Sequence, residues 1–236
     1  MDNVTLVTAV NKKYLEKFKK NFPIWGTVDL IADIKSVIVF AHKDCIVEIE
    51  KLLGECASVD VIEWSFPKAE SEREEMLTAF VHGVAEHVKT KWWIKLDCDT
   101  KPKSIHAKLP DDWQSHTMCG HKWGYTKIKS DPKWEKGLTE HWLNRLDSWA
   151  DCLEDFKGTN HLFDKKITTA RHGHSRTCSF FAIEKTGWTR HLSQMCNKTG
   201  GRMPVPSQDT LTWYGITRMG GGRTVLPYNF KRYWSP

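Results

Sequence analysis

The sequence predicts an α/β protein in which helices flank a central, mostly parallel sheet. Short runs rich in valine and isoleucine alternate with segments whose apolar residues recur every three or four positions, the spacing of amphipathic helices. The strand-like runs are apolar almost throughout, as expected when helices cover both faces of a parallel sheet. The chain has 236 residues, of which 40% are hydrophobic, and this is ample for the core of one domain.

The first half of the chain contains four predicted strands separated by three predicted helices. In the longest predicted helix, Ser71 followed by Glu74 fits the pattern of a capping box. Since strands joined through helices pair in parallel, the alternation predicts a parallel sheet. The strands are expected over 4–10, 36–42, 59–64 and 92–97, and the helices over 11–22, 45–55 and 71–90.

The second half is less regular. Its last strand is predicted to lie at a sheet edge, because Pro227 cannot donate a backbone hydrogen bond to a neighbouring strand. The elements expected here are a strand within 116–125, a helix over 138–156, a central strand within 176–188, a helix capped by Ser207, and the edge strand 224–228.

Charge and composition narrow the function only slightly. Lys and Arg number 35 against 29 Asp and Glu, a net charge of +6 that suits phosphorylated or nucleic-acid partners without requiring them. The seven cysteines never form a C-x-x-C pair, as in reduced intracellular proteins. No stretch approaches about 18 apolar residues, and the N-terminus lacks the features of a signal peptide. We therefore expect no membrane span and a cytoplasmic location, in a bacterium or a virus-infected host cell.

The stretch WWIKLDCDT (92–100) combines an apolar strand with a D-x-D motif, Asp97 and Asp99. Carboxylates two residues apart at a strand end can converge on one hard cation, and their oxygens suit Mg²⁺ or Mn²⁺. Such a cation can bridge a diphosphate and stabilise it as a leaving group. The competing interpretation is a plain strand end followed by a turn, since D-x-D alone is a common tripeptide.

With this motif closing the fourth strand, the chain resembles the GT-A glycosyltransferases, which use nucleotide-diphospho-sugars. The resemblance follows the element order over 4–234 and is strongest over 71–100 and 176–215. It implies a single GT-A domain over 1–236, whose first half, 1–100, binds the nucleotide sugar and whose second half, 101–236, binds the acceptor.

The resemblance also implies roles for residues of the first half. The nucleoside of a donor, a UDP-sugar first of all, would lie near Thr8, Ala9 and Asn11. Asp97 would contact the ribose or a metal-bound water, and Asp99 would ligate Mn²⁺ or Mg²⁺. Arg73, near the start of the helix before the motif, would lie close to the donor, although an exposed helix residue with no such role is an equal alternative.

SQDTLTW (207–213) resembles the family's late acidic element. Asp209 would act as the general base towards the acceptor hydroxyl, which favours inversion at the sugar carbon. Gln208 and Trp213 would contact the acceptor or a phosphate. The alternative is that Asp209 only complements the dipole of its helix.

Many members supply a late histidine as a further metal ligand, and here no histidine follows His191. His172 and His174 could replace it, could contact the acceptor or a phosphate, or could each lie in a plain surface loop. Together with Cys178 they offer three zinc-ligand side chains, but a fourth ligand with suitable spacing is missing.

The acceptor is expected to be a saccharide, a protein or a modified (hydroxymethylated) DNA base. Two other classes compete with this interpretation. A nucleotidyltransferase shares the sheet but normally has a glycine-rich loop after the first strand, and TAVNKKYLEK (8–17) has no glycine. A noncatalytic nucleic-acid or carbohydrate-binding protein on the same fold would need no metal.

Overall fold

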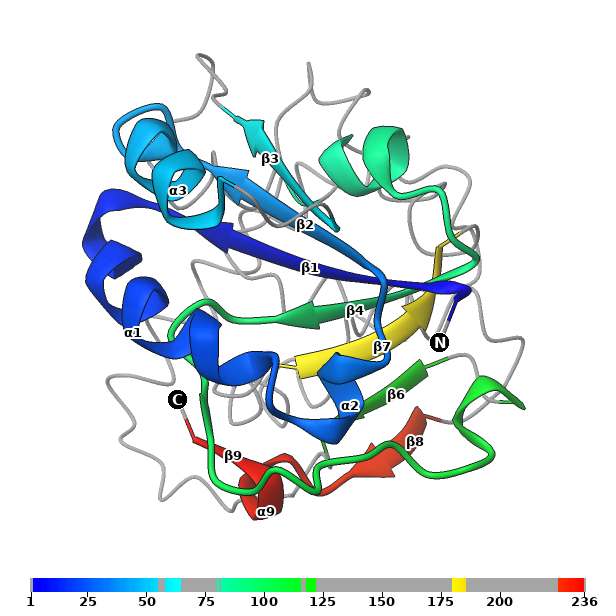
Figure 1. Ribbon diagram of the computed structural model, residues 1–236. Coiled ribbons are helices and arrows are strands. Elements are labelled where there is room, and N and C mark those ends of the chain that lie inside the picture. Colours follow the sequence, from blue (N-terminus) through cyan, green and yellow to red (C-terminus); the bar gives the residue numbers. More distant parts are fainter. Residues whose placement is uncertain are drawn as a thin grey trace, which may run out of the picture.

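The computed structural model describes residues 2–54, 58–64, 80, 82–115, 118–121, 180–185 and 225–235. These residues form a seven-stranded sheet with the order β3-β2-β1-β4-β7-β6-β8 (Figure 1). The strands are β1 (Val4–Val10), β2 (Ser36–Ala41), β3 (Val59–Glu63), β4 (Trp92–Leu96), β6 (Met118–His121), β7 (Phe180–Glu184) and β8 (Val225–Tyr228).

One strand of this sheet runs against the others. β1 pairs in parallel with both β2 and β4, and β2 pairs in parallel with β3. β7 is antiparallel to both of its neighbours, β4 and β6, while β6 and β8 are parallel. The chain leaves β1 towards β2 and β3 and then returns to β4 on the other side of β1. The strand order therefore reverses between β1 and β4, where open α/β sheets bind ligands.

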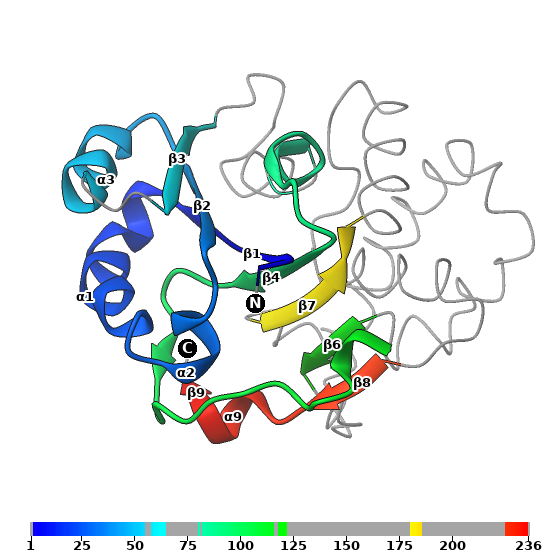
Figure 2. The same ribbon diagram turned by 45° about the vertical axis from the view of Figure 1, so that its right-hand side comes forward.

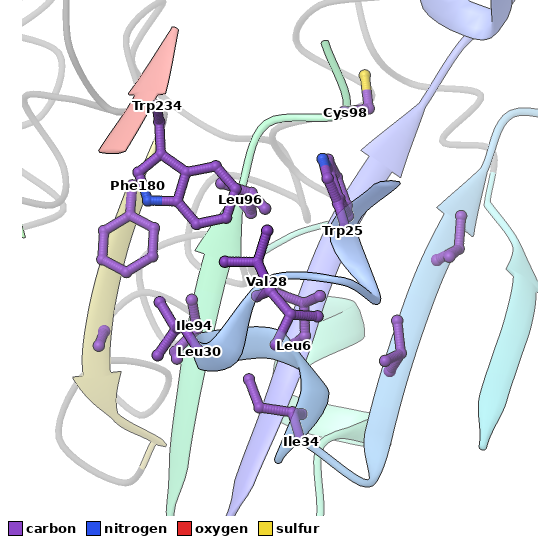
Figure 3. Packing of buried hydrophobic residues seen from close by; sticks show 14 of the residues in the cluster. Leu6, Trp25, Val28, Leu30, Ile34, Ile94, Leu96, Cys98, Phe180 and Trp234 are labelled. Atoms are coloured by element: carbon purple, nitrogen blue, oxygen red, sulfur yellow. The ribbon is translucent and has the colours of Figure 1, made fainter. Parts of the chain in front are cut away.

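Helices cover one face of the first strands. They are α1 (Leu15–Trp25), preceded by the 3-10 turn η1 (Lys12–Tyr14), α2 (Asp29–Ala32) and α3 (Ile46–Leu53). Trp25, Val28 and Leu30 pack against Leu6 and Ile94 in one buried cluster (Figure 3). Alternate residues of the strands supply this cluster, as the two-residue period of a strand requires.

A further helix, of which residues 82–87 are described, covers the opposite face of the sheet (Figure 2). Phe40 of β2 packs edge-on against Phe80, with ring centroids 6.2 Å apart. Gly83 lies directly against Phe40, since a Cβ placed on this glycine would come within 2.5 Å of the ring. Burial of both faces explains why β1 and β4 are buried along their whole length.

The C-terminal segment closes the structure beside β4. A second, two-stranded sheet pairs β5 (Lys101–Pro102) with β9 (Trp234–Ser235), and α9 (Phe230–Tyr233) precedes β9. Trp234 is buried, and its indole N–H donates to the Tyr228 hydroxyl at 3.0 Å. The 3-10 turn η2 (Trp113–Ser115) completes the described elements.

The predicted fold class is confirmed, and the predicted strands agree closely with the observed ones. Among the described strands, β8 lies at the edge of the sheet, as Pro227 indicates. One prediction was wrong at its end, because α1 continues through Pro23 to Trp25 where the sequence predicted an end at residue 22. Burial of Trp25, which is 1% exposed, stabilises that last turn. The helices predicted over 138–156 and after Ser207 lie outside the described residues.

Within the described part of the chain, no helix combines the length and apolar character needed to cross a membrane.

Candidate functional site

The D-x-D motif forms a tight turn directly after β4. The backbone N–H of Thr100 donates to the carbonyl of Asp97 at 3.0 Å, which closes the turn. The side chains of Asp97 and Asp99 are 37% and 20% exposed. Between them, Cys98 is only 6% exposed and belongs to the hydrophobic cluster (Figure 3). The middle residue therefore anchors the turn in the core, while both carboxylates remain accessible.

Asp97 is paired with a buried lysine of its own strand. Lys95 lies two residues earlier, on the same face of β4, and its ammonium forms an ion pair with the Asp97 carboxylate. The Lys95 side chain is 3% exposed, and its Nζ lies 5.8 Å from the centroid of the Phe80 ring. Because a buried ammonium requires a nearby anion, this pair restricts where the Asp97 carboxylate can lie.

Asp99 is paired with an exposed lysine of α1. Lys17 Nζ lies 3.1 Å from Asp99 Oδ2, and the Lys17 side chain is 60% exposed. The hydrogen bond to Asp99 and the charge of that carboxylate raise the pKa of Lys17 above its usual value. Lys17 Nζ also lies 5.6 Å from the centroid of the Tyr14 ring. The two carboxylates of the motif thus have lysine partners of very different exposure.

Helix α1 also holds the backbone of the turn. The side-chain amide of Asn21 donates to the carbonyl of Asp99 at 2.9 Å, and the indole N–H of Trp25 donates to the carbonyl of Thr100 at 2.8 Å. Asn21 is 5% exposed and Trp25 is 1% exposed. One partly buried and one buried hydrogen bond therefore fix the turn to a helix that is itself packed on the sheet.

The sequence interpretation missed Lys95, Lys17 and Asn21. Lys95 could have been predicted from the sequence, because a single lysine inside an apolar strand is buried and therefore needs an anionic partner. Asn21 carries a weaker signal, as an amide within the apolar stripe of a helix. Lys17 carries none, since it is one of many exposed lysines and its contact with Asp99 depends on how α1 packs.

The three residues predicted near the nucleoside lie at or close to the carboxyl end of β1. Thr8 and Ala9 are inside the strand and are 0% and 5% exposed. Asn11 follows the strand, is 5% exposed, and accepts a hydrogen bond from the backbone N–H of Tyr14 at 3.2 Å. Asn11 therefore caps η1, and the binding of a nucleoside by these residues stays a prediction.

The remaining predicted site residues lie outside the described residues. They are Arg73, His172, His174, Gln208, Asp209 and Trp213.

The two carboxylates suit a hard divalent cation. Mg²⁺ and Mn²⁺ bind oxygen ligands, and sites that serve diphosphates commonly use one or two carboxylates, with water and phosphate oxygens completing the shell. Asp97 and Asp99 offer such a pair on a rigid turn. No cluster of three or more His, Cys, Asp or Glu side chains suited to a metal occurs among the described residues. Two carboxylates are the kind of donor set that a cation bound to a diphosphate commonly uses.

Cys98 is poorly suited to act as a nucleophile, because it is buried in the hydrophobic cluster. Burial raises the pKa of its thiol far above the ordinary value, and the neighbouring charges of Asp97 and Asp99 raise it further. The thiol is therefore neutral at physiological pH and serves as an apolar anchor.

Comparisons with known proteins define the fold. No family model and no curated protein matches the sequence. Among solved structures, the chain is similar to the bifunctional glycosyltransferase WbbM in its apo form, with a TM-score of 0.54 and 8% identity over 98% of this chain and 39% of that chain. The galactosyltransferase LgtC, solved with donor and acceptor sugar analogues, gives a TM-score of 0.49 and 12% identity over 96% of this chain and 74% of that chain. The chain therefore has a GT-A-like fold, in agreement with the resemblance seen in the sequence.

Proposed function

We propose that the protein is a glycosyltransferase that transfers a sugar from a nucleotide-diphosphate sugar to an acceptor hydroxyl. The observation that carries the proposal is the D-x-D turn. In a GT-A-like fold, its two accessible carboxylates follow β4 at the point where the strand order reverses.

In this proposal, Asp99 ligates Mn²⁺ or Mg²⁺, and Asp97 contacts the donor ribose or a metal-bound water. The bound cation would neutralise charge that develops on the departing diphosphate. The chain itself contributes rigidity, because Lys95 orients Asp97 while Asn21 and Trp25 hold the turn. A site fixed in this way needs no rearrangement of its backbone when the donor binds.

The donor nucleoside would occupy the carboxyl end of β1 near Asn11, and UDP is the first choice. Asp209 would remove the proton from the acceptor hydroxyl, with inversion at the sugar carbon. The acceptor would be a saccharide, a protein or a modified DNA base.

Thermal unfolding with a panel of nucleotide sugars, each with and without Mn²⁺, tests the proposal. A donor at about 100 times its dissociation constant should stabilise the fold by roughly 2.7 kcal/mol, and the shift should require Mn²⁺. Asp99→Asn should abolish this shift. Asp111→Asn, which removes an exposed carboxylate elsewhere, should keep it.

Other outcomes would overturn the proposal. A shift with DNA or glycans but with no nucleotide sugar would identify a binding protein. A shift with a nucleoside triphosphate alone would identify a nucleotidyltransferase. For a donor that does bind, release of nucleoside diphosphate that increases when an acceptor is added would demonstrate transfer.

A further inference from the structure

The two ion pairs of the D-x-D turn differ in how easily they can be broken. Lys95 is enclosed, with a side chain that is 3% exposed, so it cannot leave Asp97 without a change in the core. Lys17 is 60% exposed and contacts Asp99 from the surface of α1. An exposed ion pair of this kind contributes little to stability, so Lys17 can exchange partners readily.

Lys17 competes with any cation for the same carboxylate. Its Nζ lies 3.1 Å from Asp99 Oδ2, so a divalent cation on that carboxylate would meet a positive charge at short range. The ammonium must then move away. Its lysine stem remains attached to α1, whose Asn21 holds the backbone of the same turn, so the displaced charge stays close to the site.

A diphosphate is the natural second partner for the displaced ammonium. A diphosphate that bridges a cation on Asp99 brings negative charge to the region that Lys17 reaches. Lys13 adds positive charge beside the same tyrosine, since Lys13 Nζ lies 5.4 Å and Lys17 Nζ 5.6 Å from the centroid of the Tyr14 ring. This local excess of positive charge favours a polyanionic ligand over a lone cation.

We propose that Lys17 is an exchangeable counter-ion. It neutralises Asp99 when no divalent cation is bound, yields Asp99 to the cation, and then pairs with the diphosphate of the nucleotide. The inference rests on the proposed function, in which Asp99 is the metal ligand. Lys17 should therefore weaken the binding of the cation alone and strengthen the binding of the nucleotide that follows.

Lys17→Met tests this inference, with Lys20→Met as the matched control. Both lysines are exposed residues of α1, and Lys20 forms no ion pair with an acidic group among the described residues. Free Mn²⁺ is measured by electron paramagnetic resonance during a titration of the protein. We expect Lys17→Met to bind Mn²⁺ about two- to fivefold more tightly than the unaltered chain, the factor that corresponds to an exposed ion pair.

In a second experiment, UDP is titrated into the protein at saturating Mn²⁺, and calorimetry measures the binding. Lys17→Met should bind UDP about tenfold more weakly, since it lacks a charge-assisted contact with the diphosphate. Lys20→Met should remain within twofold of the unaltered chain in both titrations. Circular dichroism establishes that the variants are folded.

Each contrary result has a distinct meaning. If Lys17→Met binds Mn²⁺ no more tightly than Lys20→Met, the counter-ion role is overturned. If it binds Mn²⁺ more tightly but binds UDP normally, transfer of Lys17 to the diphosphate is overturned. Asp99→Asn tests the proposed function by itself. If this variant binds Mn²⁺ as tightly as the unaltered chain does, Asp99 is not the metal ligand, and both the proposed metal site and the counter-ion inference are overturned.

Discussion

Cys98 gives the D-x-D turn its orientation at the scale of single residues. It is 6% exposed and lies in the core, while the aspartates on either side keep 37% and 20% of their side-chain surface exposed. The adjacent Lys95 is buried and ion-paired to Asp97. The D-x-D tripeptide is common in sequences and says little by itself. Here it forms a defined arrangement of charges, because the buried residues Cys98 and Lys95 determine how the two aspartates are placed.

Substitution of Lys95 by methionine tests whether Lys95 positions the Asp97 carboxylate without making a large contribution to the stability of the fold. Methionine nearly fills the same volume, and Asp97 is exposed enough to be solvated without its partner, so the free energy of unfolding should change by only about 1 kcal/mol. Without the ammonium, the Asp97 carboxylate is free to rotate, and we expect UDP to bind about tenfold more weakly in the presence of Mn²⁺. Thermal unfolding and a UDP titration provide the two measurements.

Lys91→Met serves as the control for this variant. Lys91 precedes the same strand, and its Nζ lies 3.7 Å from Glu184 Oε1, with 56% of its side chain exposed. Its loss should affect neither measurement. UDP binding in Lys95→Met that equals binding in Lys91→Met would show that Asp97 does not depend on Lys95.

At the scale of elements, local sequence predicts the strands but not all of their partners. The valine- and isoleucine-rich runs mark β1 and β2 because an apolar run that both faces bury is a local property. β3 is half-buried to exposed, and its valines and isoleucine still mark it as a strand. The insertion of antiparallel β7 between β4 and β6 depends on contacts distant in sequence. The two-residue strands β5 and β9 are too short to produce a pattern.

The same distinction applies to the candidate site. Asp97 and Asp99 could be predicted because they end an apolar strand, where the carboxyl edge of a parallel sheet places ligands. The partners of these residues on α1 could not, because they come from a helix about 80 residues away in sequence, as the Lys17–Asp99 and Asn21–Asp99 separations of 82 and 78 show. Their position depends on how that helix packs.

The helix around 82–87 lies so close to β2 that adding a single methyl group at Gly83 should lower the free energy of unfolding. In Gly83→Ala, the added Cβ would lie 2.5 Å from atoms of the Phe40 ring. Phe40 is 1% exposed and has little room to move, so we expect a loss of about 1–3 kcal/mol in the free energy of unfolding, measured with urea.

Two further variants test the origin of this loss. Gly26→Ala, at the end of α1, meets no atom within 4 Å and has a helical φ of -60°, so it should be neutral or stabilise the fold slightly. Phe40→Leu should recover part of the loss when combined with Gly83→Ala, because the smaller side chain relieves the clash. Additive effects in that double variant would contradict a direct contact.

At the scale of the whole molecule, the end of the described chain completes both sheets. β8 extends the large sheet beyond β6, and β9 pairs with β5 immediately after the D-x-D turn. The backbone N–H of Lys103 donates to the carbonyl of Tyr233 at 2.7 Å, which ties these segments together. Stability of the C-terminal segment and the position of the candidate site are therefore linked.

This closure buries titratable groups, and their burial makes stability depend on pH. Burial raises the pKa of the Cys119 thiol to about 12 and raises that of the Tyr228 hydroxyl as well. In the unfolded chain, a thiol has a pKa near 8.5. Above this value the unfolded chain releases a proton that folded Cys119 retains, so its contribution to stability is complete below about pH 8.5 and is lost as the pH rises towards 12.

The free energy of unfolding should therefore fall between pH 9 and pH 11, by up to about 1.4 kcal/mol per pH unit from Cys119, with a further contribution from Tyr228 only above about pH 10, where an unfolded tyrosine ionises. Cys119→Ala removes one of these groups and should reduce the slope by about 1 kcal/mol per pH unit, whatever the variant loses in absolute stability through its smaller side chain. Urea unfolding at several pH values, with a reducing agent present, measures both slopes. Equal slopes would mean that the Cys119 thiol ionises as readily in the folded protein as in the unfolded chain, and that the surroundings of Cys119 on β6 are open to solvent.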